Sequence, residues 1–326
     1  MRNQKWFTKL LASVFALLFG SITAQATDIC GVIPTTLTIF ENSRLTCDVE
    51  CLQTDNGPCI RFGAPGIKLD LDGFKMTGTA NDPPRTNCVT ASNFAAQEAD
   101  GIQSKFDDVV IGGPGLVQRM RRHGIALLGT SADPVENSVV KKLVSHQNCF
   151  SGIFMGFVNN TLVEGVVSAR NSANSEARPC GGVCVTNSNN NRVRRSEFAG
   201  NGSIAPGTTI PGPIPNDFGV GLVGSSSGNI IEENGIGGNI IGLALFPISA
   251  TLTPTGNLIR KNVIVGNPPI EVSAGNPAIN PVGADIRDFS APGSNTFEDN
   301  LCITYTGASP SPCLTLPKFA GHKNSH

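Results

Sequence analysis

Residues 124–171 decide the fold, and they read GIALLGTSADPVENSVVKKLVSHQNCFSGIFMGFVNNTLVEGVVSARN. This stretch contains one short pattern twice. The pattern begins with a glycine that directly precedes an aliphatic residue. An asparagine comes next, and the second residue after it is apolar. A second asparagine comes 10 or 11 residues after the first. Self-similarity with a period of roughly 20–50 residues is typical of proteins built from stacked repeats. The same pattern extends along the chain in both directions.

The glycine–aliphatic pair recurs at intervals of 23, 28, 30, 37 and 23 residues, so the base repeat is 23 residues with insertions in some repeats. The two asparagines recur with it. The glycines are Gly101, Gly124, Gly152, Gly182, Gly219 and Gly242; the marker asparagines are Asn137, Asn160, Asn191, Asn229, Asn257 and Asn295; the later asparagines are Asn148, Asn171, Asn201, Asn239 and Asn267.

The apolar residues between these markers are mainly Val and Ile, in short runs interrupted by Gly and Asn, which indicates strands and turns. Leucine-rich repeats have a similar period, but they need Leu at several fixed offsets, and Leu is sparse here. Stacked β-coils place equivalent residues about 4.8 Å apart. Asparagine amides at that spacing can form a hydrogen-bonded ladder. The sequence therefore predicts an all-β solenoid whose asparagines are structural.

Charged residues four positions after each marker asparagine alternate in sign. An exposed ion pair adds only about 0–1 kcal/mol, but a shift of one coil would align like charges. The alternation therefore predicts that six residues form one column: Lys141, Glu164, Arg195, Glu233, Lys261 and Asp299.

Over roughly residues 45–305, the chain resembles the right-handed parallel β-helix proteins of the pectin-lyase-like superfamily. The resemblance rests on residues 66–74 (GIKLDLDGF), on residues 109–115 (VVIGGPG) and on the markers above. It implies a single-stranded right-handed parallel β-helix, a solenoid with N- and C-terminal caps. The superfamily includes pectin lyases, polygalacturonases, alginate epimerases, proteins of copper-enzyme assembly and non-catalytic surface proteins. Fold alone does not fix activity.

The first 26 residues are typical of a secretory signal peptide. Three basic residues precede an apolar core at 10–20, and the segment 24–26 offers a small-x-small cleavage site. The apolar core is too short for a membrane span. We expect a secreted or periplasmic protein divided into a signal peptide (1–26), an N-terminal cap with the first coils (27–100), β-helix coils (101–302), and a C-terminal cap with a disordered tail (303–326).

All ten cysteines follow the signal peptide, which favours disulfides in an exported chain. We expect Cys302–Cys313 and, across an Asn-Gly-Pro turn, Cys51–Cys59. Cleavage would remove three of the 24 Lys and Arg residues and none of the 25 Asp and Glu residues, which leaves a net charge of −4. Nucleic-acid-binding proteins are normally basic, so no nucleic-acid partner is expected.

The candidate catalytic and substrate-binding residues are centred on residues 118–124 (QRMRRHG). Alignment on the glycine marker puts His123 on Asp100 of the preceding coil and opposite Ser151 of the next coil. Asp100 would orient the imidazole of His123 as a general base. The substrate-binding candidates are Ser151 and three arginines that could hold uronate carboxylates, namely Arg119, Arg121 and Arg122. Asp107 and Asp108 are candidate ligands for Ca²⁺. The alternative is that Asp100 and His123 form one more structural pair between coils.

Two functions remain open. One is a protein that binds an acidic polysaccharide or cell-surface glycan and, with a working His123–Asp100 pair, processes it as a polysaccharide lyase or related enzyme. Loops at 172–181, 202–217 and 268–284 would then wall its groove. The other is a non-catalytic surface or periplasmic structural or adhesion protein, because no known catalytic set is complete. The sequence does not decide whether the protein is an enzyme, nor its oligomeric state.

Overall fold

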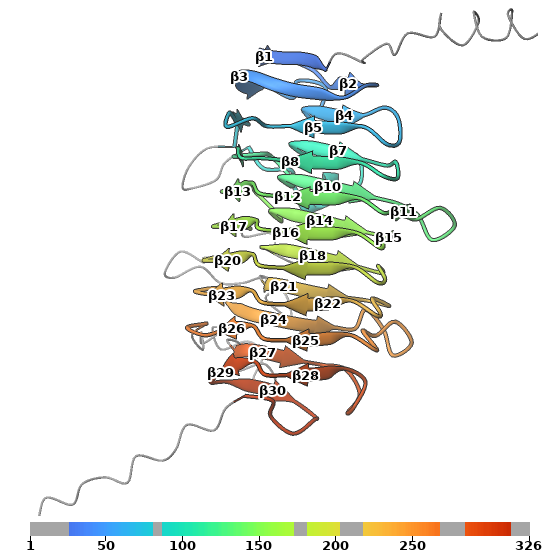
Figure 1. Ribbon diagram of the computed structural model, residues 1–326, viewed down its shortest axis with the longest axis vertical. Coiled ribbons are helices and arrows are strands. Elements are labelled where there is room, and N and C mark those ends of the chain that lie inside the picture. The colour runs from blue at the N-terminus through green and yellow to red at the C-terminus, as the bar shows by residue number, and fades with distance from the viewer. Residues whose placement is uncertain (1–25, 81–86, 173–180, 203–217, 268–283, 314–326) are drawn as a thin grey trace, which may run out of the picture.

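The chain winds into a stack of coils that contribute short strands to the same three faces (Figure 1). The computed structural model describes residues 26–80, 87–172, 181–202, 218–267 and 284–313. Within these ranges neighbouring coils pair in parallel, and the helical structure is one 3-10 helix, η1 (Ala91–Asn93). The predicted all-β, right-handed parallel β-helix is confirmed.

Face I is a ten-stranded sheet, and its strands are β2 (Leu37–Ile39), β4 (Ile60–Phe62), β7 (Ile102–Ser104), β10 (Ile125–Leu128), β14 (Ile153–Gly156), β18 (Val183–Thr186), β21 (Phe218–Val223), β24 (Ile241–Phe246), β27 (Ala284–Asp288) and β30 (Tyr305–Gly307). Face II contains β5 (Lys68–Asp70), β8 (Val110–Gly112), β12 (Val139–Lys141), β16 (Leu162–Glu164), β19 (Arg192–Arg194), β22 (Ile230–Glu232), β25 (Leu258–Arg260) and β28 (Thr296–Glu298).

Face III follows face II in each coil and contains β6 (Lys75–Thr77), β9 (Leu116–Gln118), β13 (Val144–His146), β17 (Val167–Ala169), β20 (Glu197–Ala199), β23 (Gly235–Gly237), β26 (Val263–Ile264) and β29 (Leu301–Cys302). The longer strands β1 (Thr27–Ile33) and β3 (Ser43–Cys51) extend across faces II and III at the N-terminal end. A short pair, β11 (Val135–Glu136) and β15 (Val158–Asn159), lies where face I turns into face II.

The core is a set of aliphatic columns inside the coils. The aliphatic residue of each glycine marker pairs with its equivalent in the next coil, and the whole column is fully buried: Ile102, Ile125, Ile153, Val183, Val220, Leu243 and Ile286. The marker glycines have a packing reason. A Cβ on Gly124 would lie 2.2 Å from Ser145 Oγ and 2.7 Å from Asn148 Nδ2.

Three asparagine ladders run along the coils in the part of the chain that the structure describes. In each step the side-chain oxygen accepts hydrogen bonds from the backbone N–H and the side-chain amide of the previous coil, as Asn239 does for Asn201 at 3.0 and 2.9 Å. The ladders are Asn148–Asn171–Asn201–Asn239–Asn267, Asn191–Asn229–Asn257–Asn295 and Asn234–Asn262–Asn300. The first two correspond to predicted asparagines, whereas the third was not predicted.

Two marker asparagines lie outside the ladders. Asn137 and Asn160 occupy the preceding corner position with φ of 54° and 52°, a left-handed conformation that asparagine tolerates. The ladder positions beside them belong to Ser138 and Thr161. Ser138 N–H donates to Thr161 Oγ1, and Thr161 N–H donates to Asn191 Oδ1.

The predicted single column of charges is wrong by one residue. Lys141 pairs in register with Glu164, and Glu164 pairs with Arg194 rather than Arg195. Charges of alternating sign form two adjacent columns instead. The column at the end of face II alternates throughout (Lys141, Glu164, Arg194, Glu232, Arg260, Glu298), and the column at the corner that follows it alternates from Arg195 onward (Lys142, Gly165, Arg195, Glu233, Lys261, Asp299). Glu164 contacts Arg194 at 2.9 Å and Arg195 at 3.5 Å, so the coils stack as expected.

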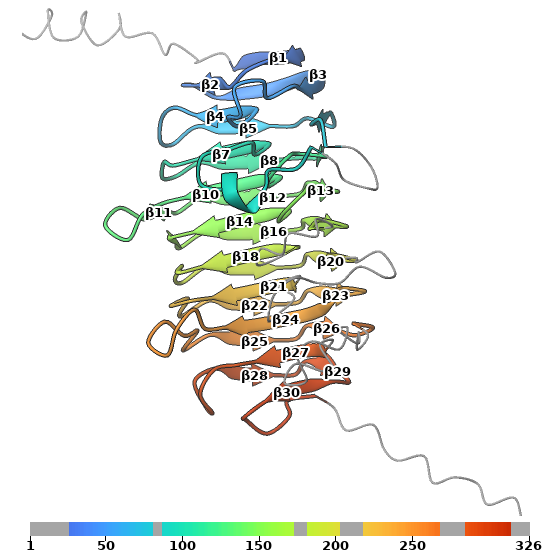
Figure 2. The same ribbon diagram turned by 180° about the vertical axis from the view of Figure 1, so that it is seen from behind.

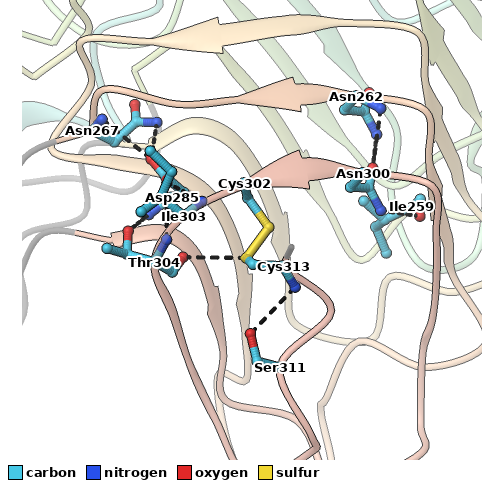
Figure 3. The surroundings of a disulfide bond; sticks show 10 residues. All are labelled: Ile259, Asn262, Asn267, Asp285, Asn300, Cys302, Ile303, Thr304, Ser311 and Cys313. Atoms are coloured by element: carbon cyan, nitrogen blue, oxygen red, sulfur yellow. Dashed lines mark hydrogen bonds between the residues drawn. A yellow bond between two sulfur atoms is a disulfide. The ribbon is translucent and has the colours of Figure 1, made fainter. Parts of the chain in front are cut away.

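Disulfides secure both ends of the solenoid. The two predicted bonds, Cys51–Cys59 and Cys302–Cys313, are present, together with Cys30–Cys47 and Cys88–Cys149. Figure 3 shows Cys302–Cys313 beside the ends of two ladders. There Asp285 Oδ1 accepts from the side-chain amide of Asn267, and Asp285 Oδ2 accepts from the backbone of the last coil.

Several predicted segments lie outside the described residues: the signal peptide to residue 25, most of the loops at 172–181, 202–217 and 268–284, and the tail after residue 313. Residues 27–80 contribute β1 to β6, which extend the same faces. Among the residues that the structure describes, no helix is long and apolar enough to cross a membrane.

Candidate functional site

The structure brings Asp100, His123 and Ser151 together in consecutive coils, as the alignment predicted. The backbone N–H of His123 donates to Asp100 Oδ1 at 3.1 Å, and the backbone N–H of Ser151 donates to His123 Nδ1 at 3.2 Å. Asp100 therefore contacts the backbone of His123. Because Nδ1 accepts a hydrogen bond, the neutral imidazole carries its proton on Nε2.

The imidazole of His123 is enclosed by aromatic rings. It stacks on Phe154 at 4.6 Å between ring centroids and meets Phe94 edge-on at 5.8 Å. His123 is 2% exposed. Burial lowers the pKa of His123 well below 6.5, and the neighbouring Arg122 cation lowers it further. The ring is therefore uncharged at neutral pH.

Arg122 is a buried partner of Asp100. Its guanidinium Nη1 lies 3.6 Å from Asp100 Oδ2, and its Cζ lies 4.4 Å from the ring centroid of Phe94. Burial raises the pKa of Asp100 to about 6, although Arg122 and the His123 N–H act in the opposite direction. The charge of Arg122 is thus directed toward a carboxylate inside the protein.

Residues 87–100, here called the strap, cover this cluster. The strap carries η1 and Phe94, and Cys88–Cys149 ties it to the coil after β13. Figure 2 shows η1 lying across the outside of face I. Arg121 extends the attachment, since it donates to Asn87 O and Asn56 Oδ1. In this arrangement a polymer does not reach the His123 ring, and the catalytic roles of His123 and Asp100 stay predictions.

The remaining candidates lie at separate corners. Arg119 is half-buried at the corner after β9 with φ of 56°. Asp107 Oδ1 accepts from the backbone N–H of Glu136 at 2.8 Å, and Asp108 has φ of 58°. In the described part of the chain, no group of three or more His, Cys, Asp or Glu residues could hold a metal ion. A Ca²⁺ site at Asp107 and Asp108 stays a prediction.

Face I is closed on its outer side. The outward residues Ala126, Cys184 and Ala244 on β10, β18 and β24 are all fully buried. Cys184 and Ala244 belong to a second apolar cluster, separate from the main core. The outside of face I therefore offers no open path for a polymer along these strands.

Face III is open and hollowed. A groove of about 640 Å³ crosses β17, β20, β23 and β26. Its floor contains the register column Val167, Glu197, Gly235 and Val263. A Cβ on Gly235 would meet no atom within 4 Å, so the depression exists because this outward position lacks a side chain.

Basic residues flank the groove toward the N-terminal end of face III. The outward positions of β9, β13 and β17 carry no acidic residue (Leu116, Gln118, Val144, His146, Val167 and Ala169). The corners beside these strands carry Arg119, Lys142 and Arg170. With His146, these three residues are here called the basic flank. Lys142 is exposed and forms no ion pair with a described residue.

Sequence reasoning missed this groove. The available signal was the run of small residues at one repeat position, Ala169, Ala199 and Gly237, which the structure shows to face outward in successive coils. Without the register, small residues on the two sides of a strand cannot be told apart.

Comparisons with known proteins agree with this architecture. A family model described as the right handed beta helix region matches residues 87–303. Tailspike protein 2 from Escherichia coli O157:H7 bacteriophage CAB120 is 11% identical, with a TM-score of 0.55 over 88% of this chain and 37% of that chain. The alginate lyase from Paenibacillus sp. str. FPU-7 is 12% identical, with a TM-score of 0.50 over 87% and 92%. The chain thus spans little more than a third of the tailspike, and no curated protein matches it in sequence.

Proposed function

This chain belongs to the right-handed β-helix family, and we propose that it binds an acidic polysaccharide along face III. The ligand class comes from the name of one neighbour of the same fold, an alginate lyase. The observation in this chain that carries the proposal is the groove, which lies beside the basic flank at β17, while the outside of face I is closed.

The geometry suits a linear polymer. Equivalent groove residues recur at each coil, about 4.8 Å apart, which is about the length of one sugar unit in an extended chain. The polymer would lie parallel to the solenoid axis, over the small residues of the floor. The positive charges of the basic flank would attract its carboxylates. The disulfides support a secreted or periplasmic location, because such bonds persist in oxidising compartments.

Filling the groove tests the site. Gly235→Gln places a side chain in open space on the floor and keeps the charge unchanged. Gly112→Gln is the matched control, because it lies on face II and its Cβ would meet only Lys68 Cε at 3.8 Å. Affinity electrophoresis through a gel containing polyuronate should retain the natural protein and Gly112→Gln, and Gly235→Gln should bind at least about tenfold more weakly. Absence of retention, or equal retention of all three proteins, would overturn the proposal.

Binding without cleavage is the second candidate, because His123 and Asp100 are enclosed. An ultraviolet assay for unsaturated sugar products on a panel of polyuronates distinguishes binding without cleavage from lyase activity. Release of product by the natural protein and its loss in His123→Ala would establish a lyase. No product, together with retention in the gel, would establish a non-catalytic surface or adhesion protein.

A further inference from the structure

Glu197 is an uncompensated charge on the floor of the groove. It lies on β20, is exposed, and pairs in register with the uncharged residues Val167 and Gly235. It forms no ion pair with a described residue. The column at the end of face II differs in this respect, because each of its charged residues has an opposite charge in a neighbouring coil.

The nearest cation along the chain does not neutralise Glu197. Arg195 lies two residues earlier, at the corner, and its guanidinium is directed to two other carboxylates. Its Nε lies 2.9 Å from Glu233 Oε2, and its Nη1 lies 3.5 Å from Glu164 Oε1. The Glu197 carboxylate is therefore left as an acceptor at the groove floor, beside the small residues Ala199 and Gly235.

The same face thus carries two different environments. The basic flank extends along β9, β13 and β17, and Glu197 follows on the next strand, β20. A polymer parallel to the axis would place one unit over the flank and a later unit over Glu197. A carboxylate attracts hydroxyl donors through charge-assisted hydrogen bonds and repels another carboxylate.

We infer that Glu197 is a specificity-determining residue that accepts hydroxyl groups of a neutral sugar and rejects a uronate at that position. The ligand is then a heteropolysaccharide that combines neutral and acidic units, rather than a homopolymer of uronates. This inference rests on the proposed function and adds the composition of the polymer.

Glu197→Gln tests the inference, because it removes the charge and nearly preserves the shape. Isothermal titration at low ionic strength would compare oligogalacturonate, in which every unit is acidic, with hyaluronan fragments, in which glucuronate alternates with a neutral amino sugar. Glu298→Gln is the matched control, since Glu298 is exposed on face II, away from the groove.

We expect the natural protein to bind hyaluronan fragments more tightly than oligogalacturonate. Glu197→Gln should bind oligogalacturonate about five- to tenfold more tightly, as expected for removal of one like charge about 4 Å away in water, and hyaluronan fragments several-fold more weakly. The gain should disappear in about 1 M salt, where the Debye length is about 3 Å.

An unchanged or lower affinity of Glu197→Gln for oligogalacturonate would overturn the inference. The outcome for the proposed function is separate. If Gly235→Gln still weakens polyuronate binding, the groove is the binding site and only the role of Glu197 is wrong. If Gly235→Gln also has no effect, the site itself is wrong.

Discussion

Oδ1 of Asp100 accepts a hydrogen bond from the backbone of His123, while burial shifts the pKa values of the two side chains in opposite directions. The pKa of Asp100 rises from 3.8 to about 6, and that of His123 falls well below 6.5. Between about pH 4 and 6, the folded chain holds a proton on Asp100 that the unfolded chain has lost. In the same window the unfolded chain holds a proton on His123 that the folded chain excludes.

The protonation of Asp100 and the protonation of His123 have opposite effects on how stability changes with pH. Stability decreases with rising pH where the folded state binds more protons, and increases where the unfolded state does. Asp100 therefore makes the free energy of unfolding fall with rising pH between about pH 4 and 6. His123 makes the free energy of unfolding rise with pH below pH 6.5. In the natural protein the two contributions nearly cancel across their shared window.

His123→Gln should leave only the pH dependence of stability that Asp100 causes. Relative to the natural protein, its free energy of unfolding should fall by up to about 1.4 kcal/mol for each unit of rising pH between pH 4.5 and 6. Urea titrations at the two pH values measure this change. A slope equal to that of the natural protein would contradict the burial of one of the two groups.

Asp100→Asn should show the opposite behaviour. With the carboxyl removed, the linkage of His123 remains, and relative stability should rise with pH by up to about 1.4 kcal/mol per unit in the same window. The double variant is the control, because its stability relative to the natural protein should change little with pH. Slopes of the same sign in the two single variants would contradict the assignment.

Asn234→Ala should strongly destabilise the solenoid. Its oxygen accepts from Ser196 N–H, and its amide donates to Val193 O and Asn262 Oδ1. The substitution leaves two or more buried groups without partners, each worth about 1–3 kcal/mol, so we expect a loss of about 3 kcal/mol in the free energy of unfolding.

The control for the ladder variant is Asn190→Gly. Asn190 is exposed at a corner with φ of 57°, and the equivalent corner positions of the next two coils are Gly228 and Gly256. This substitution should change the free energy of unfolding by less than about 1 kcal/mol. Similar losses in both variants, measured by urea unfolding, would argue against a special role of the ladder.

Glu232→Gln should weaken a partly buried charge network. Glu232 is 3% exposed and accepts hydrogen bonds from both Arg192 and Arg260. Burial alone would raise the pKa of Glu232, but the two arginines lower it overall. Its stabilisation is therefore present above the unfolded value of 4.5 and is lost as pH falls below that value. We expect a loss of about 2 kcal/mol at pH 7.

Glu233→Gln is the comparison for that variant. Glu233 contacts Arg195 at the exposed corner, where such a pair adds about 0–1 kcal/mol. Chemical denaturation at pH 7 should therefore show a smaller loss than for Glu232→Gln. At pH 3, where Glu232 begins to lose its charge, the loss caused by Glu232→Gln should shrink. Equal losses at pH 7 would show that burial of Glu232 does not strengthen the contribution of its ion pairs to the free energy of unfolding.

The repeat markers were sufficient to predict the coils, because they record local requirements of the backbone. A marker glycine such as Gly124 is required where a Cβ would collide with the neighbouring coil, and an aliphatic residue such as Ile125 must fill the core. These constraints return at every coil and so are visible as a period. The stacking of Asp100, His123 and Ser151 followed from the same alignment.

Register at single-residue precision could not be predicted. The run Asn189-Asn190-Asn191 offers three asparagines to one ladder position, and the hydrogen bonds select Asn191. The marker residues Asn137 and Asn160 occupy instead the corner position equivalent to Asn190, so counting four residues from each marker put Arg195 in the column of Lys141, although Arg194 occupies it.

The sequence by itself determined the solenoid and two of its asparagine ladders, because these depend on spacing that the chain repeats, and it determined two disulfides between cysteines that are close in sequence. Only the tertiary structure decided which surfaces are open. The strap encloses His123 although it precedes that residue by more than 20 positions, and Gly235 leaves a groove only because Glu197 and Val263 flank it in adjacent coils. The exposure of a surface depends on which distant segments pack against it, and the repeat pattern does not specify those contacts.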